Sequence, residues 1–355
     1  MPDKRKRQIR VPSKNQYLSF ILSAILTIMI VLGAYGFRMY ADAKSSVDKT
    51  YVQLKNKSTT DKKVKATKPI SILLIGTDTG SLGRTAKLGN ADTIMVVTIN
   101  PKKNKTTMVS IPRDTFAKIQ GGSYNYAKIN SSFLVGGTNC TVKTVEKLLN
   151  VPIDYYVTVN MGGLSQIVDA VGGVDVDVPF SWSDTEHDGG TFTKGTAHLN
   201  GKRALQFARM RYKDPDGDYG RQRRQQQVIS AIVKSLLSAN TLTNYESVLK
   251  TLDGNLQMNL TFDNLVSIAN GYRDAVKNFK KTQMKEIGAY IGKAAYQIPS
   301  TETLQSISDE LRAQLGLEKQ TLDNDNVTQN ALNAANGFSW SSDIDQTYSV
   351  LSSAE

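Results

Sequence analysis

The sequence RALQFARMRYKDPDGDYGRQRRQQQ occupies residues 203–227, and its arrangement of charges is the most informative feature of the chain. Eight lysine or arginine residues lie between Lys202 and Arg224, against three aspartates in the same interval. Arg209 and Arg211 are two positions apart, so in an extended chain both side chains point to the same side. The pattern predicts a focused group of cations rather than an evenly charged surface.

A turn and a helix are predicted in the second half of this stretch. Residues 214–217 read DPDG, a composition typical of a tight turn, and a helix is expected to begin near Arg221. Its apolar residues recur at the spacing of one buried stripe: Val228, Ile229, Ile232, Val233, Leu236 and Leu237. Arg221 and Gln225 continue that stripe toward the helix start. An inward-facing arginine there predicts a partly buried anion, held by guanidinium and free backbone N–H groups.

Two other interpretations of the basic run remain open. Charged residues are mostly exposed, so the run could be a solvated face, although its arginines fall on an apolar stripe. A basic run can also contact nucleic acid. Asp214, Asp216 and Asp218 interrupt the run and argue against a surface that follows a phosphate backbone. Nucleic acid is therefore not expected as a partner.

The net charge of +12 on 355 residues is concentrated near one end of the chain. Residues 1–16 carry six lysine or arginine residues against one aspartate, and residues 44–68 carry eight lysines against two aspartates. The remainder is close to neutral. The two basic segments flank residues 17–37, YLSFILSAILTIMIVLGAYGF, which contain 21 residues and no charge.

This uncharged segment has the length of a transmembrane helix, because about 20 apolar residues span a bilayer. Tyrosines near both ends and a basic cluster before it predict a cytoplasmic N-terminus, with the body of the protein outside the cytoplasm. A cleavable signal peptide is the alternative, but the segment is long for one and lacks a clear cleavage site. Cys140 is the only cysteine, which excludes an internal disulfide and is compatible with a Gram-positive cell surface.

The remaining chain alternates predicted strands and helices. The strands are expected at 70–75, 93–99, 107–111, 153–159, 174–178 and 285–291, and the helices at 164–171, 222–239, 244–253 and 262–279. This order predicts an α/β fold with a mixed central sheet and helices on both faces, preceded by one N-terminal transmembrane helix.

Five segments are expected along the chain. They are a cytoplasmic basic tail (1–16), the transmembrane helix (17–37), a lysine-rich linker (38–68), an extracytoplasmic α/β domain (69–315) and a polar C-terminal tail (316–355). The tail is rich in Asn, Asp, Ser and Thr and is expected to be poorly packed, with Trp340 as its single bulky anchor.

Polar residues at strand ends suggest a metal site and further anion contacts. Asp78 follows one predicted strand and Asp92 precedes the next, so neighbouring strands would bring the two carboxylates together. Carboxylates, phosphate oxygens and water are common ligands of Mg²⁺; the alternative is that both aspartates cap turns. Arg113 follows Pro112 at another strand end and Lys128 lies in the sequence KIN, although such a lone arginine is more often part of a surface salt bridge.

Several common catalytic patterns are missing from the sequence. It has no G-x-x-x-x-G-K-[ST] phosphate loop and no G-x-S-x-G nucleophile turn. His187 and His198 are the only histidines, so a zinc cluster is not expected and His198 is interpreted as structural.

Six segments, in order along the chain, resemble the LytR-CpsA-Psr family. They read LLIGTD (73–78), ADTIMVVTINP (91–101), VSIPRDT (109–115), KIN (128–130), VDAVGGVDVDVP (168–179) and HLNGKRALQFARMRYKDPDGDYGRQRRQQ (198–226). The resemblance covers roughly residues 70–240, and its last motif is highly specific. It implies a membrane-anchored phosphotransferase that moves an anionic glycopolymer, such as teichoic acid or capsular polysaccharide, from a polyprenyl-pyrophosphate carrier to peptidoglycan.

The resemblance also implies roles for individual residues. Asp78 and Asp92 would hold Mg²⁺ or Mn²⁺. The pyrophosphate would be bound by Arg113, Lys128, Arg209, Arg211, Arg221 and Gln225. Arg113, Arg221 and Asp218 would be catalytic, with Asp218 orienting an arginine or handling a proton. The residues at 80–90 and 181–190 would adapt the site to the acceptor.

Two other classes of function stay open from the sequence. A pyrophosphatase acting on the lipid-linked glycan would use the same residues, with water as the acceptor. A non-catalytic wall-binding or regulatory protein is the other class, although no helix-turn-helix pattern is present. The polyprenyl tail of a lipid substrate needs an apolar groove near the membrane, and the seam that starts at Val228 could line it.

Overall fold

The computed structural model describes residues 14–54, 67–79, 89–121, 126–184, 190–236, 254–341 and 345–351, and for 14–26 and 184 it describes the backbone alone. The chain divides into two compact units, Met1–Ser45 and Ser46–Glu355. The first unit holds most of helix α1 (Lys14–Thr50), which contains the predicted transmembrane segment 17–37. Within the described part of the chain, no helix is both long enough and apolar enough to cross a membrane.

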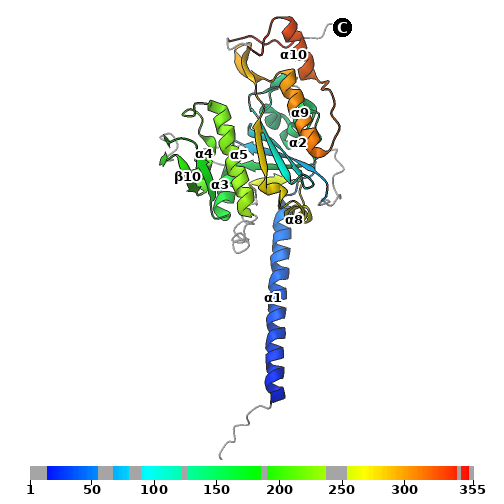
Figure 1. Ribbon diagram of the computed structural model, residues 1–355, viewed down its shortest axis with the longest axis vertical. Coiled ribbons are helices and arrows are strands. Elements are labelled where there is room, and N and C mark those ends of the chain that lie inside the picture. Colours follow the sequence, from blue (N-terminus) through cyan, green and yellow to red (C-terminus); the bar gives the residue numbers. More distant parts are fainter. Residues whose placement is uncertain are drawn as a thin grey trace, which may run out of the picture. The chain divides into compact units, whose positions relative to one another are not determined.

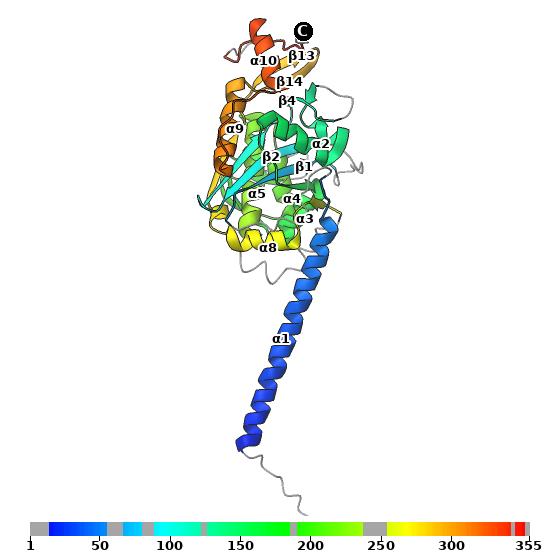
Figure 2. The same ribbon diagram turned by 90° about the vertical axis from the view of Figure 1, so that its right-hand side faces the viewer.

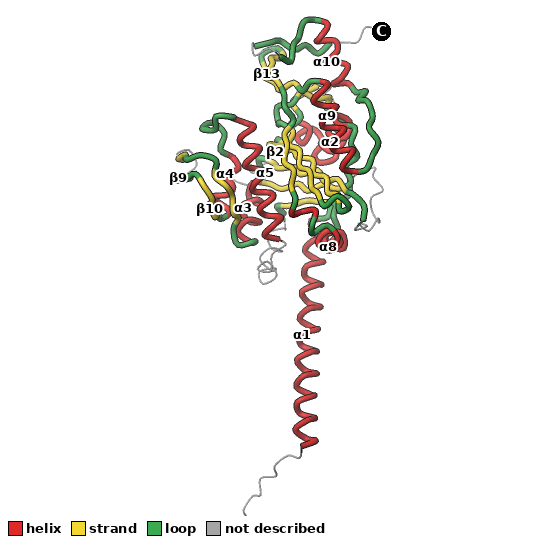
Figure 3. The backbone as a smooth tube through the Cα atoms, viewed as in Figure 1, coloured by secondary structure: helices red, strands yellow, loops and turns green. Residues whose placement is uncertain are grey.

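A six-stranded mixed sheet forms the centre of the second unit. Its strands lie in the order β11 (Leu256–Met258), β6 (Tyr155–Asn160), β1 (Ile70–Thr77), β2 (Ala91–Asn100), β3 (Lys105–Ile111) and β12 (Phe279–Gln283). The pairs β1–β6 and β3–β12 are parallel, and the other neighbours are antiparallel. Figure 3 shows these strands in yellow at the centre of the unit.

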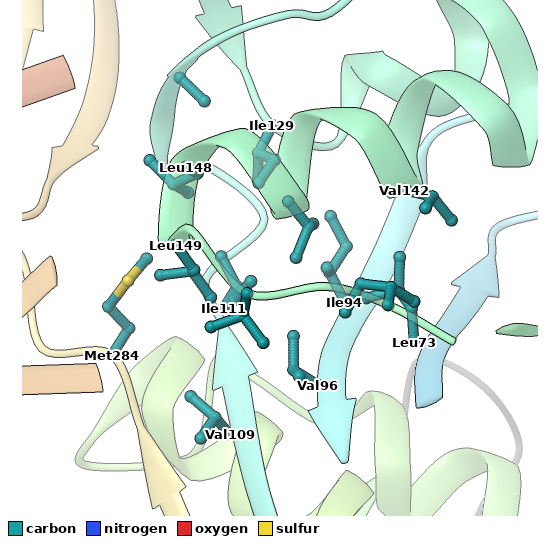
Figure 4. Packing of buried hydrophobic residues seen from close by; sticks show 14 of the residues in the cluster. Leu73, Ile94, Val96, Val109, Ile111, Ile129, Val142, Leu148, Leu149 and Met284 are labelled. Carbon is teal, nitrogen blue, oxygen red and sulfur yellow. The ribbon is translucent and has the colours of Figure 1, made fainter. Parts of the chain in front are cut away.

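Alternate residues of the sheet enter two separate cores, as expected for side chains that point to opposite faces. One face packs against α2 (Ser131–Leu149) and α9 (Thr301–Leu315). In Figure 4, Leu73, Ile94, Val96, Val109 and Ile111 of the strands meet Val142, Leu148 and Leu149 of α2. The opposite face packs against α5 (Gly217–Leu236) and α8 (Phe262–Gly271) (Figures 1 and 2). The predicted mixed sheet with helices on both faces is therefore confirmed.

A smaller lobe lies beside α5. It contains α3 (Met161–Ala170), β7 (Val174–Val178), β8 (Trp182–Asp184), β9 (Gly190–Phe192), β10 (Gly195–Leu199) and α4 (Gly201–Arg209). β7 and β10 form an antiparallel pair. The lobe's core packs onto Val228 and Ile232 of α5, so one face of this helix serves the lobe. Because α5 also packs on the sheet, it joins the two parts of the unit.

Several elements depart from the sequence prediction. The helix predicted over 262–279 ends at Gly271; a 3₁₀ turn (Ala275–Lys277) follows, and β12 pairs with β3 from Phe279 onward. The strand predicted over 285–291 is β13 (Ile287–Ile291), which pairs with β14 (Ala294–Ile298) outside the central sheet. Helix α2 was not predicted, because Gly136 and Gly137 interrupt its pattern with a kink. The helix predicted at 244–253 lies outside the described residues.

The prediction of a poorly packed tail after residue 316 is wrong. The segment forms α10 (Asp325–Ala335), and its buried amides bond to main-chain carbonyls and other polar groups. Asn330 Nδ2 donates to Pro299 O at 2.9 Å, and Asn330 Oδ1 accepts from Tyr348 Oη at 2.8 Å. Tyr348 and Phe338 enter an aromatic cluster with Phe116, so Trp340 is not the single anchor. Buried amides are acceptable here because their hydrogen bonds are satisfied.

The predicted linker 38–68 also contributes to the second unit. Val47 and Leu54 are buried in the two cores of the sheet, and Val52 N donates to Met258 O at 2.8 Å. Residues 55–66 of the linker and residues 1–13 of the basic tail lie outside the described residues.

Candidate active site

A cavity of about 880 Å³ lies between the sheet, α5 and α8, and its volume is within the range of ligand pockets. Most of its wall is apolar and comes from the second core of the sheet and from the two helices. These residues include Ile72, Leu74, Val97, Met108, Val157, Ile229, Val233, Leu265 and Ile268. The polar and charged residues that line it include Asp92, Arg113, Arg209, Arg211, Arg221 and Gln225. The cavity therefore combines an apolar surface with a group of arginines.

Those six polar residues are all predicted site residues, and the structure brings them to one cavity. Three others lie close by in different settings. Asp218 contacts Arg221 and lines a narrow crevice with Arg113 and Gln225. Asp78 lies at the neighbouring end of β1. Lys128 is directed to Asp114, with an Nζ–Oδ1 distance of 2.9 Å. Lys128 is thus a partner of an aspartate beside Arg113, rather than part of the cavity wall.

Arg221 is buried on the inward face of α5, as the stripe predicted. Its Nη2 lies 2.6 Å from Asp218 Oδ1, three residues earlier on the helix. Its Nε is buried and has no hydrogen-bond partner among the described residues. Burial lowers the Arg221 pKa and Asp218 opposes that shift, while the charges of Arg113 and Arg211 add to it. A buried guanidinium with an unsatisfied donor, beside other cations, favours an anionic ligand.

The backbone N–H groups near Arg221 were expected to help hold that anion, and this expectation is wrong. Helix α5 begins at Gly217, four residues earlier than predicted. The N–H groups of Gly217, Tyr219 and Gly220 already donate to the carbonyls of Asp214 and Asp216. An anion bound beside Arg221 would therefore be held mainly by side chains.

The predicted turn at 214–217 is confirmed, and it contains an ion pair that sequence reasoning missed. Gly217 N donates to Asp214 O at 2.9 Å, and Gly217 adopts a φ of 51° that suits glycine. Asp214 accepts from Arg224 Nη1, and both side chains are buried. Arg224 also donates through Nε to Phe207 O at 2.9 Å and through Nη2 to Met210 O. Arg224 thus attaches the loop that contains Arg211 to α5. Its position three residues after Arg221, on the same helix face, was the sequence feature that could have indicated its burial.

Arg209 and Arg211 do not lie in a single extended segment. Arg209 is the last residue of α4, a helix that begins after Asn200, whose side chain accepts from Arg203 N at 3.0 Å. Arg211 follows in the loop, with its Nε 3.8 Å from Asp218 Oδ1. The extended conformation assumed for both residues is therefore wrong, although both still reach the cavity.

Arg113 extends from the end of β3 toward Asp92 of β2. Its Nη1 donates to Asp92 Oδ1 at 2.8 Å, and its Nε lies 3.7 Å from Asp114 Oδ2. Burial alone would lower the Arg113 pKa, but the hydrogen bond to Asp92 and the charges of Asp92, Asp114 and Asp218 raise it on balance. Arg113 therefore makes a salt bridge, as strand-end arginines often do, while also lining the cavity.

Asp78 and Asp92 lie at paired ends of two antiparallel strands, as predicted. Thr77 pairs with Ala91, and Asn90 N donates to Asp78 Oδ1 at 3.0 Å. Asp78 thus caps a turn as well. In the described part of the chain, no group of three or more Asp, Glu, His or Cys residues could hold a metal ion. The donor set fits Mg²⁺ only as two carboxylates completed by ligand oxygens and water, which is common for this ion.

His198 has the contacts of a structural residue. Its Nδ1 lies 2.8 Å from Asp175 Oδ1, and its Nε2 lies 3.0 Å from Gly172 O. These contacts link β10 to β7 and to the turn before it, and none of the three residues lines the cavity. His187 lies outside the described residues.

Comparisons with known proteins identify the family. The LytR_cpsA_psr family model matches residues 35–313. A polyisoprenyl-teichoic acid–peptidoglycan teichoic acid transferase, TagU of Enterococcus faecalis, is 38% identical over 297 residues, covering 84% of this chain and 96% of that protein. The crystal structure of gbs0355 from Streptococcus agalactiae shares 36% identity at a TM-score of 0.65, covering 73% of this chain and 91% of that one. The solved structure of TagT bound to LIIa-WTA shares 29% identity at a TM-score of 0.62, covering 75% and 100%. The chain therefore belongs to the LytR-CpsA-Psr family.

Proposed function

We propose that this protein transfers an anionic glycopolymer from a polyprenyl-pyrophosphate carrier to peptidoglycan. The observation that carries the proposal is the cavity of about 880 Å³, whose apolar walls adjoin the guanidinium groups of Arg113, Arg211 and Arg221. A lipid chain and a pyrophosphate joined in one molecule match this combination. Family membership and the activity named for the TagU relative support the same reaction.

The reaction requires an acceptor hydroxyl oxygen to bond to the phosphorus that carries the glycan. The bond from that phosphorus to the bridging oxygen breaks, polyprenyl phosphate leaves, and the hydroxyl proton is released. Negative charge grows on the bridging oxygen, so positioning and electrostatic stabilisation supply most of the catalysis. Arg221, with its unsatisfied Nε, and Arg113 are the side chains we assign to that charge.

Asp218 is assigned an orienting role in this scheme. Its Oδ2 accepts from Gln222 Nε2 at 3.0 Å, and its Oδ1 lies against Arg221. Through this ion-pair contact, Asp218 holds the guanidinium of Arg221 in place. Gln225, one turn further along α5, lines the cavity beside it.

Asp78 and Asp92 are proposed to hold Mg²⁺ or Mn²⁺, which would add positive charge at the phosphate oxygens. We expect a chelator to stop transfer and added Mg²⁺ to restore it. Asp92→Asn is expected to lower the transfer rate on the order of 10²-fold, the typical effect of removing one charge-stabilising group. Asp92 also pairs with Arg113, so a lower rate could come from lost metal binding or from the lost ion pair. Asp78→Asn and a direct measurement of Mn²⁺ binding separate these two causes.

The matched control is Asp216→Asn, since Asp216 is an exposed carboxylate that pairs with Arg223 outside the cavity. It should retain wild-type transfer. Transfer at the full rate in excess chelator would show that the reaction does not require a metal ion.

The protein is proposed to be anchored in the cell membrane by residues 17–37, with the second unit outside the cytoplasm. The support is the uncharged sequence flanked by basic residues. In the described part of α1, the large side chains of Ile28–Leu32 are 57–64% exposed, an apolar run that needs a cover. We expect Thr60→Cys, made in a Cys140→Ser background, to react with a membrane-impermeant maleimide in intact cells.

The control for this labelling is Ser13→Cys in the basic tail, which should react only after lysis. The opposite pattern, with Thr60→Cys protected until lysis, would show that the orientation is wrong.

The transfer itself is tested with the full chain, a defined lipid-linked glycan and peptidoglycan fragments. The expected product is a glycan joined to peptidoglycan through a phosphodiester, together with polyprenyl phosphate. Release of the glycan phosphate alone, with peptidoglycan present, would instead identify a pyrophosphatase. Binding without any product would identify a wall-binding or regulatory protein.

A further inference from the structure

Glu286 is a buried acidic residue that the reaction described above does not use. It lies between β12 and β13, next to the chain that leaves β3 and to the start of α5. The residue is partly exposed as a whole, but its Oε2 is buried and has no hydrogen-bond partner among the described residues. Its Oε1 lies 2.7 Å from Thr115 Oγ1. An ionised carboxylate in this setting would lack the donors that a buried charge requires.

The two short contacts of the Thr115 hydroxyl indicate whether Glu286 carries a proton. Thr115 Oγ1 lies 2.7 Å from Glu286 Oε1 and 2.6 Å from Pro112 O, and both are distances of hydrogen-bonded oxygens. A hydroxyl has one proton, and a carbonyl oxygen has none. If the Thr115 proton goes to Pro112 O, the proton of the other contact must come from Glu286. If it goes to Glu286 instead, two lone pairs face each other at 2.6 Å.

We propose that Glu286 is an uncharged positioning residue, which donates its proton to Thr115 and thereby fixes the turn that presents Arg113. Two hydrogen bonds then follow one another: Glu286 Oε1–H donates to Thr115 Oγ1, and Thr115 Oγ1–H donates to Pro112 O. Pro112 directly precedes Arg113, so the conformation of this turn determines where the guanidinium lies. The effect on transfer rests on the proposed function, whereas the protonation of Glu286 does not.

The charges around Glu286 favour the same state. Burial raises the Glu286 pKa well above its ordinary value of 4.5, and the charges of Asp114 and Asp218 add to the shift. A hydrogen bond donated by Thr115 to the ionised carboxylate would oppose it. From α5, Tyr219 Oη accepts from Glu286 N at 2.9 Å, and burial raises the Tyr219 pKa to about 12. Lys285 lies with its Nζ 4.4 Å from the centre of the Tyr219 ring. The cations that contact the two aspartates are Arg113, Lys128, Arg211 and Arg221.

A neutral Glu286 also suits a site that binds an anion. Asp92, Asp114 and Asp218 already offset the charges of the arginines there, and a further carboxylate would weaken attraction for pyrophosphate. A carboxylic acid supplies the hydrogen bond without the charge. Glutamine can supply the same bond through its amide, and it cannot ionise.

The first test compares the unfolding equilibrium of wild-type protein and Glu286→Gln across pH. Below pH 4.5 the glutamate holds its proton in both the folded and the unfolded state, so it makes no pH-dependent contribution. Above pH 4.5 the unfolded state loses the proton first, and wild type loses stability until the pH passes the folded-state pKa. The ratio of the two unfolding constants should therefore change by up to about tenfold per pH unit in this window, in favour of Glu286→Gln.

Infrared spectroscopy of the wild-type protein gives a second measurement, which does not require the variant to fold. Carboxyl groups with ordinary pKa values are ionised at pH 7, so the carbonyl band of a protonated acid is diagnostic. We expect this band at neutral pH and its loss at alkaline pH. A constant stability offset between wild type and Glu286→Gln at every pH, or the absence of the band, would overturn the proposal.

Transfer measurements complete the test with the full chain. Wild-type transfer should fall at alkaline pH as Glu286 ionises, and Glu286→Gln should lack that fall. Thr115→Ser keeps the hydroxyl and should behave as wild type. Thr115→Val removes both hydrogen bonds of that hydroxyl and should lower transfer at all pH values. If the stability and infrared results hold but wild type transfers nothing, the proposed function fails and the protonated Glu286 stands. An identical alkaline fall in Glu286→Gln would exclude the positioning role.

Discussion

Arg221→Lys is expected to keep the fold and to lower the rate of glycan transfer by about 10²–10³-fold, the typical effect of removing one charge-stabilising donor. Arg221 can direct two parallel N–H groups at neighbouring phosphate oxygens, a geometry that the lysine ammonium does not reproduce. Its buried Nε has no partner among the described residues, so this donor remains available to a ligand. The measurement is the transfer rate from a lipid-pyrophosphate donor, taken together with the melting temperature.

Stability should change little in this variant. Arg221 lies among Arg113 and Arg211, whose charges oppose its own, while the charges of Asp218 and Asp92 favour it. The matched control is Arg223→Lys, two residues along the same helix. Arg223 is 45% exposed and pairs with Asp216, so it should transfer at the wild-type rate. Transfer at the wild-type rate by Arg221→Lys would show that phosphate binding does not depend on the paired N–H groups of the guanidinium. A large fall in melting temperature would show that Arg221 is a structural ion-pair residue.

The central strands were predictable because burial on both faces leaves a simple pattern in the sequence. β1, β2 and β3 were predicted within two residues at each end. β7 of the smaller lobe was predicted at its observed bounds from a different pattern, the alternation of buried and exposed residues. β12 reads FKKTQ and has no such pattern. It is a strand because five of its residues pair with β3 in parallel, so tertiary contacts decided its conformation.

The tail shows a second limit of sequence patterns. α10 buries Asn326, Gln329, Asn330 and Asn333, which read as surface residues in a sequence. Their amides bond to carbonyls far along the chain, as when Asn326 Nδ2 donates to Phe116 O at 2.8 Å. Hydrophobic periodicity cannot detect a helix whose buried side is made of satisfied amides.

For the site, the motif residues could be predicted and their supports could not. Six of the predicted residues line one cavity because strand ends, the end of α4 with the loop after it, and the first turns of α5 meet there. The contact between Thr115 and Glu286 joins residues 171 positions apart, and no pattern in the sequence indicates that the two side chains meet. Arg224 was hidden in a different way, since it looked like one more cation in a basic run. Only its burial distinguishes it from Arg223.

Arg224→Met is expected to destabilise the protein by about 3–5 kcal/mol, because it leaves Asp214 buried without its partner. The exposed fractions of the two side chains are 1% and 3%, so solvent does not screen the loss. Phe207 O and Met210 O also lose a donor, and the guanidinium leaves the faces of Trp182 and Phe207. The measurement is the free energy of unfolding from denaturant titration.

The double variant Asp214→Asn with Arg224→Met should recover part of this loss, because it removes the uncompensated charge. Arg223→Met, at the adjacent exposed position, is the matched control and should unfold near the wild-type midpoint. Transfer by Arg224→Met should also fall at temperatures where it remains folded, since the loop bearing Arg211 loses its attachment to α5. Wild-type stability in Arg224→Met would mean that the buried pair contributes nothing to the fold. Reduced stability with unchanged transfer would mean that Arg211 keeps its position without it.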